Sequence, residues 1–222
     1  MEALSPEPES PQTFVFADLA GYTALTEIHG DRHAADAAAD FFRATRTLLD
    51  SHDAEEIKSI GDALMLRSSN ATQAARLAER IVCDYGSRHR ALGIRVGMHT
   101  GPAVQRGADW FGAAVNVASR VADSARAGEV LLTAETRNAI GQSVPTRRLG
   151  ARRLKNVSEP VEIYELVLDT TAQVLPIDPV CRMTLDPVLA PEQRVYRGTT
   201  YFLCSRTCAQ RFDLEPSRYT RS

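Results

Sequence analysis

The dipeptide Gly61-Asp62 constrains the fold most, because it marks a tight reversal between two apolar stretches. Residues 55–60 and 63–67 each have the composition of a short strand, and glycine followed by aspartate is typical of a turn. Strands joined by so short a turn must pair antiparallel, since a parallel pair needs a crossover of about a dozen residues or more. The hairpin therefore excludes a sheet built only from parallel strands.

The patterns around this hairpin alternate between strand and helix. Apolar periodicity predicts strands over residues 13–17, 92–101 and 129–133, helices over 31–53, 70–86, 111–128 and 134–140, and a closing strand pair over 144–155 and 161–168. Because hairpins interrupt the alternation, this order predicts an α+β fold with a mainly antiparallel sheet.

The charge balance and the N-terminus limit the partners and the compartment. The net charge is −2, so we expect no nucleic acid and no anionic membrane as a partner. Apolar runs stay below the roughly 18 residues that span a bilayer, and the acidic, proline-rich residues 1–12 predict a disordered tail rather than a secretory signal. We therefore expect a cytoplasmic protein whose cysteines are free thiols or metal ligands.

Two aspartates stand where predicted strands reverse. Asp18 follows one apolar strand and Asp62 another, so both side chains could lie at one edge of the sheet. Two close carboxylates repel each other unless one is protonated or a cation lies between them, and Mg²⁺ suits such a pair. The alternative is that each aspartate is an ordinary turn residue.

Five segments occur in order over residues 13–167: "FADLAGYTALTE", "IKSIGDALM", "GIRVGMHTG", "ADWFGAAVNVASR" and "LKNVSEPVEIYEL". Together they resemble the catalytic domain of class III nucleotidyl cyclases. The resemblance implies a ferredoxin-like βαββαβ core with extra αβ elements. It also implies a head-to-tail homodimer with the active sites at the interface.

The resemblance further implies roles for individual residues. Asp18 and Asp62 would hold two Mg²⁺ or Mn²⁺ ions per active site. Lys58 and Asp109 match the pair that reads adenine, where relatives that use GTP typically carry glutamate and cysteine.

Three more positions match the family. Asn116 would orient the ribose, Arg120 would stabilise charge on the reacting phosphate, and Lys155 would bind the triphosphate. One chain would supply the two aspartates and its partner the other five residues. An arginine that helps to bind triphosphate in some relatives has no clear match here, and Arg106 is the nearest candidate.

Each of these residues also has an ordinary explanation. Lys58 could guard a strand edge against aggregation, Asp109 could cap a loop, and Asn116 and Arg120 could belong to a polar helix face. Because all seven positions carry the family's residues, we favour an adenylate cyclase that converts ATP to 3′,5′-cyclic AMP and pyrophosphate by two-metal-ion catalysis. The alternatives are a non-catalytic dimer that binds nucleotide and carries a metal module, and a metal-handling protein whose large domain only dimerises.

The composition changes after a predicted linker at residues 169–176, which follows the predicted catalytic domain at 13–168. Residues 177–222 are too few to rely on an apolar core alone, and they contain Cys181, Cys204 and Cys208. Thiolates suit Zn²⁺ or another soft metal, although buried cysteines can also be plain apolar residues. "DPVCRMTLDP" and "YRGTTYFLCSRTCAQRF" resemble the YHS domain, which implies a small treble-clef-like metal module.

A tetrahedral site in this module would lack a fourth ligand. All histidines of the chain precede residue 100, so Asp178, a water molecule or a partner is left. The fusion of the two domains leads to the hypothesis that metal or redox state regulates the cyclase through residues 177–222.

Overall fold

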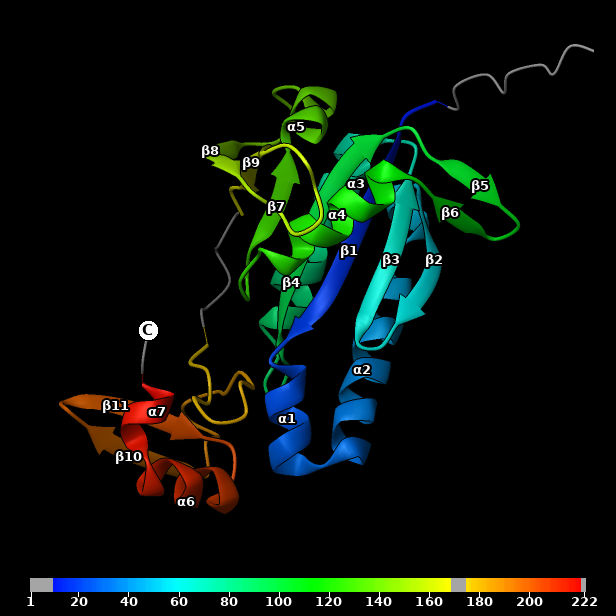
Figure 1. The fold of residues 1–222 in the computed structure, drawn as a ribbon. Helices are drawn as coiled ribbons and strands as arrows, with labels where there is room; N and C mark the ends of the chain where they lie inside the picture. Colours follow the sequence, from blue (N-terminus) through cyan, green and yellow to red (C-terminus); the bar gives the residue numbers. More distant parts are fainter. Residues whose placement is uncertain (1–9, 169–174, 221–222) are drawn as a thin grey trace, which may run out of the picture.

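The hairpin expected around Gly61 is formed by β2 (Ala54–Ile60) and β3 (Ala63–Ser68), at one edge of a seven-stranded sheet (Figure 1). The structure is a computed structural model and describes residues 10–168 and 175–220. Most of the predicted N-terminal tail (1–9) and of the predicted linker (169–174) lies outside the described residues.

The sheet has the strand order β2-β3-β1-β4-β7-β9-β8. Its other strands are β1 (Gln12–Ala20), β4 (Gly93–Gly101), β7 (Val130–Thr133), β8 (Thr146–Arg152) and β9 (Val161–Leu166). Among the described strands only β4 and β7 pair parallel, so the predicted α+β fold with a mainly antiparallel sheet is confirmed.

Helices cover both faces of the sheet. They are α1 (Tyr22–His29), α2 (Asp31–Arg46), α3 (Ala71–Arg80), α4 (Ala113–Asp123) and α5 (Ala134–Ile140). The chain through β4 follows the predicted βαββαβ order, and a small hairpin of β5 (Val104–Arg106) and β6 (Asp109–Phe111) leads from β4 to α4. No helix of the described residues is long and apolar enough to cross a membrane.

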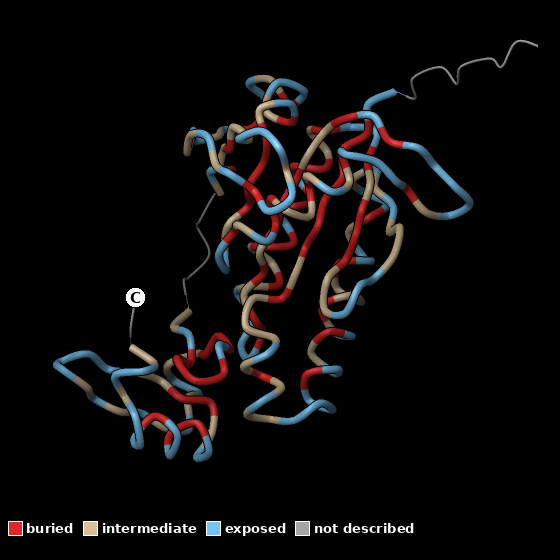
Figure 2. Tube along the Cα trace, viewed as in Figure 1, coloured by how far each residue is buried: buried red, intermediate tan, exposed pale blue. Residues whose placement is uncertain are grey.

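Residues of β1 alternate between the two faces of the sheet. Phe14 and Phe16 pack with the side chains of α4, whereas Val15 and Ala17 pack with those of α1, α2 and α3. Successive strand residues point to opposite faces, so Asp18 belongs to the α4 face. Buried residues accordingly follow the central strands and the inner sides of the helices (Figure 2).

Helix α4 lies unusually close to β4. A Cβ atom added to Gly97 would come within 2.0 Å of the backbone nitrogen of Ala122 and 2.7 Å of the carbonyl oxygen of Ala118. Only glycine permits this approach. The contact fixes α4 over the centre of the sheet and beside the end of β1.

In the large domain two predicted helices are too long, and one helix was not predicted. The helix expected over 31–53 ends at Arg46, and the one expected over 111–128 ends at Asp123. Helix α1 follows β1 through Gly21, whose φ of 98° is left-handed, and it has no side-chain N-cap to signal its start. In contrast, the predicted cap of α3 is confirmed, because Asn70 Oδ1 accepts the backbone N–H of Thr72 at 3.0 Å.

The C-terminal module consists of a turn, a hairpin and two short helices beside α1 (Figure 1). Its regular elements are β10 (Glu192–Tyr196), β11 (Thr199–Leu203), α6 (Arg206–Leu214) and α7 (Pro216–Tyr219). The module is joined to the large domain by backbone hydrogen bonds: Arg90 N–H donates to Thr184 O and Thr184 N–H donates to Ala91 O, each at 2.8 Å. Leu92 and Met183 form a bridge beside them.

Candidate functional site

Asp18 and Asp62 lie together at one end of the sheet. β1 pairs with β3 so that Asp18 is opposite Ala63, the residue after Asp62. Both carboxylates line the same two cavities, of about 390 and 240 Å³. One detail of the prediction is wrong, because Asp18 lies inside β1, which continues to Ala20.

The two carboxylates repel each other in this arrangement. The pKa of Asp62 is raised to about 6, first by burial and then by the charge of Asp18 and a hydrogen bond with it. Arg95 of β4 lies opposite Asp18 and donates from Nε to Asp18 Oδ2 at 2.7 Å. A divalent cation would relieve the remaining repulsion, and carboxylate oxygens are the ligands that Mg²⁺ prefers. The residues present therefore fit the metal ions that the resemblance implied.

Lys58 and Asp109 form an ion pair between β2 and β6. Lys58 Nζ is 2.5 Å from Asp109 Oδ2, and the ammonium lowers the pKa of Asp109. The other carboxylate oxygen of Asp109 accepts the backbone N–H of Trp110 at 2.8 Å, so the residue also caps its loop. Lys58 thus pairs with Asp109 rather than with Asp62.

A third cavity, of about 310 Å³, lies beside this ion pair. Its walls are mainly apolar, with Lys58, Asn116 and Ser119 as polar groups, and its lining includes Phe16, Ile60, Met65, Trp110, Phe111, Gly112 and Val115. Phe16, Ile60 and Ser119 also line the 240 Å³ cavity at the aspartates. The two sets of predicted residues therefore face adjoining spaces on the α4 side of the sheet.

Four predicted residues do not line these cavities: Asp109, which pairs with the cavity-lining Lys58, and three others. Arg120 follows Asn116 by one turn of α4, but its guanidinium pairs with Asp123 at 2.7 Å. Lys155 is exposed in the connection between β8 and β9, and Arg106 is exposed in the β5–β6 hairpin opposite Asp109. Within the described residues, no hydrogen bond or ion pair joins these three side chains to Asp18 or Asp62.

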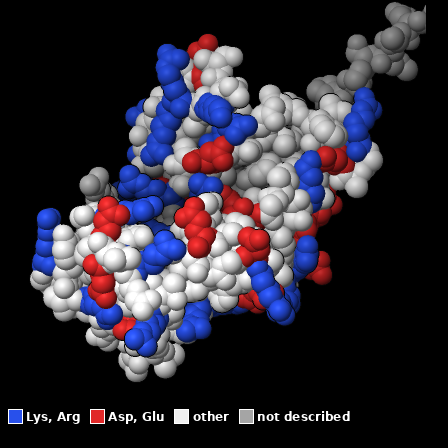
Figure 3. Space-filling model, turned by 60° about the horizontal axis from the view of Figure 1, so that its bottom comes forward, with Lys and Arg blue, Asp and Glu red and all other residues white. Residues whose placement is uncertain are grey.

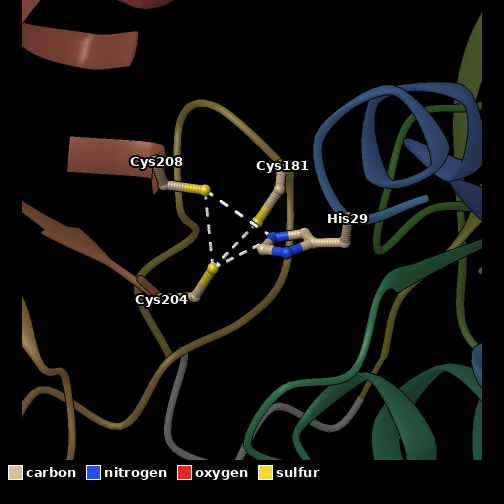
Figure 4. A group of neighbouring side chains, drawn as sticks. All are labelled: His29, Cys181, Cys204 and Cys208. Carbon is tan, nitrogen blue, oxygen red and sulfur yellow. Dashed lines mark hydrogen bonds between the residues drawn. The ribbon is translucent and has the colours of Figure 1, made fainter. Parts of the chain in front are cut away.

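The three cysteines of the module converge on one point (Figure 4). Cys181 comes from the turn before the hairpin, Cys204 follows β11, and Cys208 lies in the first turn of α6. Their sulfur atoms are close: Cys204 Sγ is 3.4 Å from Cys181 Sγ and 3.5 Å from Cys208 Sγ. All three are free thiols.

The fourth side chain at this point is His29, from the last turn of α1. Its Nε2 lies 3.3 Å from Cys204 Sγ and 3.7 Å from Cys208 Sγ. The expectation that left Asp178, a water molecule or a partner as the fourth ligand is therefore wrong in setting the histidines aside, because the nearest candidate is a histidine of the other domain. No spacing in the sequence signals this contact, because it depends on how the domains dock.

Asp178, a possible fourth metal ligand by sequence, binds backbone N–H groups instead. It is fully buried, and its carboxylate accepts the backbone N–H groups of Val180 at 2.8 Å, Cys181 at 3.3 Å and Cys204 at 2.7 Å. These bonds orient the carboxylate toward the backbone and fix the segments that carry two of the cysteines.

Charged side chains of both signs are mixed over the lower face of the molecule. In Figure 3, Lys and Arg lie among Asp and Glu rather than in one broad area of a single sign. This distribution matches the small net charge of −2.

Comparison with known proteins places both domains. The family described as "Adenylate and Guanylate cyclase catalytic domain" matches residues 4–167, and the YHS domain family matches 177–222. A pH-sensitive adenylate cyclase of Mycobacterium tuberculosis is 32% identical over 159 residues, which cover 69% of this chain and 40% of the relative. An uncharacterised protein of the same species is 32% identical over 151 residues, 68% of this chain and 40% of its own length. The chain therefore spans less than half the length of these relatives.

Solved structures show the same fold. An adenylate cyclase from Trypanosoma brucei in its monomeric state superposes with a TM-score of 0.68 at 23% identity, over 82% of this chain and 96% of that one. An adenylate/guanylate cyclase/hydrolase from Silicibacter pomeroyi gives a TM-score of 0.60 at 25% identity, over 72% and 98%. By its large domain this chain belongs to the class III adenylate and guanylate cyclase family, and it carries a YHS domain at residues 177–222.

Proposed function

We propose that this protein is an adenylate cyclase, which converts ATP to 3′,5′-cyclic AMP and pyrophosphate. The observation that carries the choice of ATP is the Lys58–Asp109 pair beside an apolar cavity of about 310 Å³. An ammonium donates to a ring nitrogen of adenine, and a carboxylate accepts from its 6-amino group. Guanine presents a carbonyl and an N–H group instead, so it would leave these groups unpaired, which is costly in a desolvated site.

Asp18 and Asp62 are proposed to hold the divalent ions. The raised pKa of Asp62 supports this role. The carboxylates are partly buried, and Arg95 balances only one of their two negative charges. When bound, Mg²⁺ or Mn²⁺ supplies charge stabilisation and lowers the pKa of the attacking ribose hydroxyl. The cavity walls contributed by Phe16 and Ile60 would exclude water from the base-binding end.

The active enzyme is proposed to be a homodimer whose sites combine residues of both chains. Among the described residues, the printed side-chain partner of Arg120 is Asp123 and Lys155 is exposed, so both side chains are open to a site completed by the partner chain. Large apolar side chains are also exposed around this region: Ile60 and Phe111 are each 52% exposed, and Val104 is 46% exposed. A partner chain that covers them would gain hydrophobic stabilisation.

The proposal is tested by cyclic nucleotide production from the purified full chain, with ATP or GTP and with Mg²⁺ or Mn²⁺. We expect cyclic AMP from ATP, and loss of product in both Asp62→Ala and Arg120→Ala. A folded, dimeric protein that forms neither cyclic nucleotide would overturn it in favour of the non-catalytic nucleotide-binding platform.

Mixing the two inactive variants tests the shared site. A heterodimer of Asp62→Ala with Arg120→Ala retains one intact site of the two. Random exchange of equal amounts should therefore restore about a quarter of the wild-type rate. If the mixture stays inactive after subunit exchange is demonstrated, each site is built within one chain.

The YHS module is proposed to be treble-clef-like and to regulate the cyclase. The order of its elements, a turn followed by a hairpin and a helix, supports a treble-clef-like fold. Ile177 and Arg182 support regulation, because they line the same 390 Å³ cavity as Asp18 and Asp62. The test compares cyclic AMP formation by the full chain with and without one equivalent of Zn²⁺, and with a mild thiol oxidant, in wild type and Cys208→Ser. Equal rates in all conditions would contradict regulation and leave the cyclase proposal intact.

A further inference from the structure

We propose that His29 of the catalytic domain and the three cysteines of the YHS domain form one four-ligand site for a soft metal ion, which joins the two domains. The site does not depend on whether the large domain makes cyclic AMP. The ligand atoms of His29, Cys181, Cys204 and Cys208 all lie within 4.8 Å of one another.

The spacing of the sulfur atoms favours a metal over a disulfide. A disulfide holds its sulfur atoms about 2.05 Å apart. The closest sulfur pairs here are 3.4 and 3.5 Å apart. Around a tetrahedral zinc ion with Zn–S bonds of about 2.3 Å, neighbouring ligand atoms are about 3.8 Å apart. The two sulfur pairs are slightly closer than that spacing, and no pair of the four ligand atoms is farther apart than 4.8 Å.

The types and number of the ligand atoms define the class of ion. Three thiolates and one imidazole are the donor set of a closed, four-coordinate zinc site, and soft thiolates also suit Cu⁺. Cys181 and Cys208 are fully buried and Cys204 is 3% exposed, so the sulfur atoms are shielded from water, whereas His29 is half-buried. Mg²⁺ and Ca²⁺, which prefer oxygen ligands, do not fit this set.

The backbone around the cysteines is already fixed. Asp178 binds the N–H groups of Cys181 and Cys204, and Ser205 Oγ accepts the N–H of Cys208 at 3.2 Å. Such supporting bonds orient the ligands of metal sites. These bonds therefore hold the cysteines in place before an ion binds.

The position of His29 gives the site its interdomain character. Helix α1 begins just after β1, which carries Asp18, and ends at His29. An ion held by His29 and the cysteines would tie the far end of this short helix to the YHS domain (Figure 4). The backbone bonds between residues 90–92 and 183–184 already bring the two domains together.

The test uses Co²⁺ as a spectroscopic probe for the full, reduced chain. We expect one equivalent to bind with the visible bands of a tetrahedral site and with thiolate-to-metal charge transfer. In His29→Ala the affinity for Co²⁺ should fall at least about tenfold and the visible bands should shift, as water replaces imidazole. His33→Ala is the matched control, because His33 is exposed and its ring lies 5.2 Å from that of His29, but His33 does not belong to the ligand group.

Hydrogen exchange gives a second measurement that distinguishes a shared site from one confined to the module. Zn²⁺ should slow exchange at the end of α1 and in residues 178–208 of the wild type. In His29→Ala it should slow exchange in residues 178–208 only. Unchanged Co²⁺ affinity and spectrum in His29→Ala, or Zn²⁺ protection that never includes α1, would overturn the proposal.

The geometry also assigns Arg182 of the YHS domain to the substrate cavity, an inference that rests on the proposed function. Arg182 lines the 390 Å³ cavity with Asp18, Asp62 and Arg126. Its stem packs against Gly21, where an added Cβ would lie 2.5 Å from Arg182 Cβ.

The charge of Arg182 is available for a ligand. Within residues 10–168 and 175–220 its guanidinium makes no ion pair, whereas Arg95 in the same cavity is already bonded to Asp18. Guanidinium groups bind phosphate oxygens in bidentate fashion, so Arg182 fits the triphosphate of a nucleotide whose metal ions lie on Asp18 and Asp62.

Inorganic tripolyphosphate with Mn²⁺ tests this assignment without turnover. In Arg182→Gln its affinity should fall about tenfold, the size expected for one charged hydrogen bond, and the KM for ATP should rise similarly. Arg211→Gln, an exposed arginine on α6, is the control and should change neither. If tripolyphosphate affinity is unchanged in Arg182→Gln, the assignment is wrong. If tripolyphosphate binds as expected but no cyclic AMP forms, only the proposed function fails.

Discussion

The aspartate site and the cysteine–histidine site are built in different ways. Asp18 and Asp62 are brought together by the register of two neighbouring strands, within one sheet. The cysteines are brought to His29 by the docking of a second domain onto α1. The two aspartates are positioned by the folding of one domain, whereas the cysteine–histidine site forms only when the two domains are in contact. The following predictions test whether the two sites can be perturbed separately.

Loss of Asp62 should have the largest effect and should leave the other site unchanged. We expect Asp62→Ala to lower the cyclase rate by roughly a thousandfold, because metal stabilisation supplies several kcal/mol of the barrier. Co²⁺ binding by the cysteines should be that of the wild type. Asp36→Ala, on the exposed side of α2, is the control and should retain full activity. A parallel loss of Co²⁺ binding would mean that the two sites are not separate.

The sheet that holds the aspartates should not tolerate a larger residue at Gly97. We expect Gly97→Ala to lower the free energy of unfolding by about 3 kcal/mol, since the new methyl group meets the backbone of α4. Urea unfolding followed by circular dichroism measures this change. Gly86→Ala is the matched control, because an added Cβ there meets nothing within 4 Å and its φ is −64°. Equal stabilities of the two variants would show that α4 is not held by this contact.

Exchange of the proposed base-reading pair should change nucleotide specificity without affecting the aspartate site or the cysteine–histidine site. The double variant Lys58→Glu, Asp109→Cys carries the residues typical of relatives that use GTP. Its ratio of kcat/KM for ATP over GTP should fall by about a hundredfold, because adenine would leave buried groups unpaired. Initial rates with both nucleotides measure the ratio. An unchanged ratio would remove Lys58 and Asp109 from base selection.

His99 should give the smallest effect, on stability rather than activity. Burial lowers the pKa of His99, and its Nδ1 lies 2.8 Å from Thr133 Oγ1. Because the folded state disfavours the proton, stability should decline as the pH falls below the unfolded value of about 6.5. In His99→Gln this part of the pH dependence should flatten, as measured by thermal unfolding between pH 5 and 8. A decline that is unchanged in the variant would assign it to other groups.

The sequence was informative where local pattern determines structure. The Gly61-Asp62 hairpin and the Asn70 cap depend on neighbouring residues, and both were predicted correctly. Helix α1 was missed, because it is short and begins at a left-handed glycine without a side-chain cap.

Residues that reach a site through long-range contacts could not be found in this way. Arg95 meets Asp18 through the pairing of β1 with β4, and a strand register is not visible in a single sequence. His29 and Arg182 depend on domain docking, which no local spacing encodes. The family resemblance identified the residues that its members share, but not those that this combination of domains brings in.

The central claim is that the protein makes cyclic AMP, with ATP chosen by Lys58 and Asp109. The most direct test offers ATP and GTP together, at equal concentration, to the purified full chain with Mn²⁺, and measures both cyclic products. We predict cyclic AMP in large excess, and roughly a thousandfold less product from Asp62→Ala. Cyclic GMP as the main product, or neither product from a folded dimer, would contradict the account.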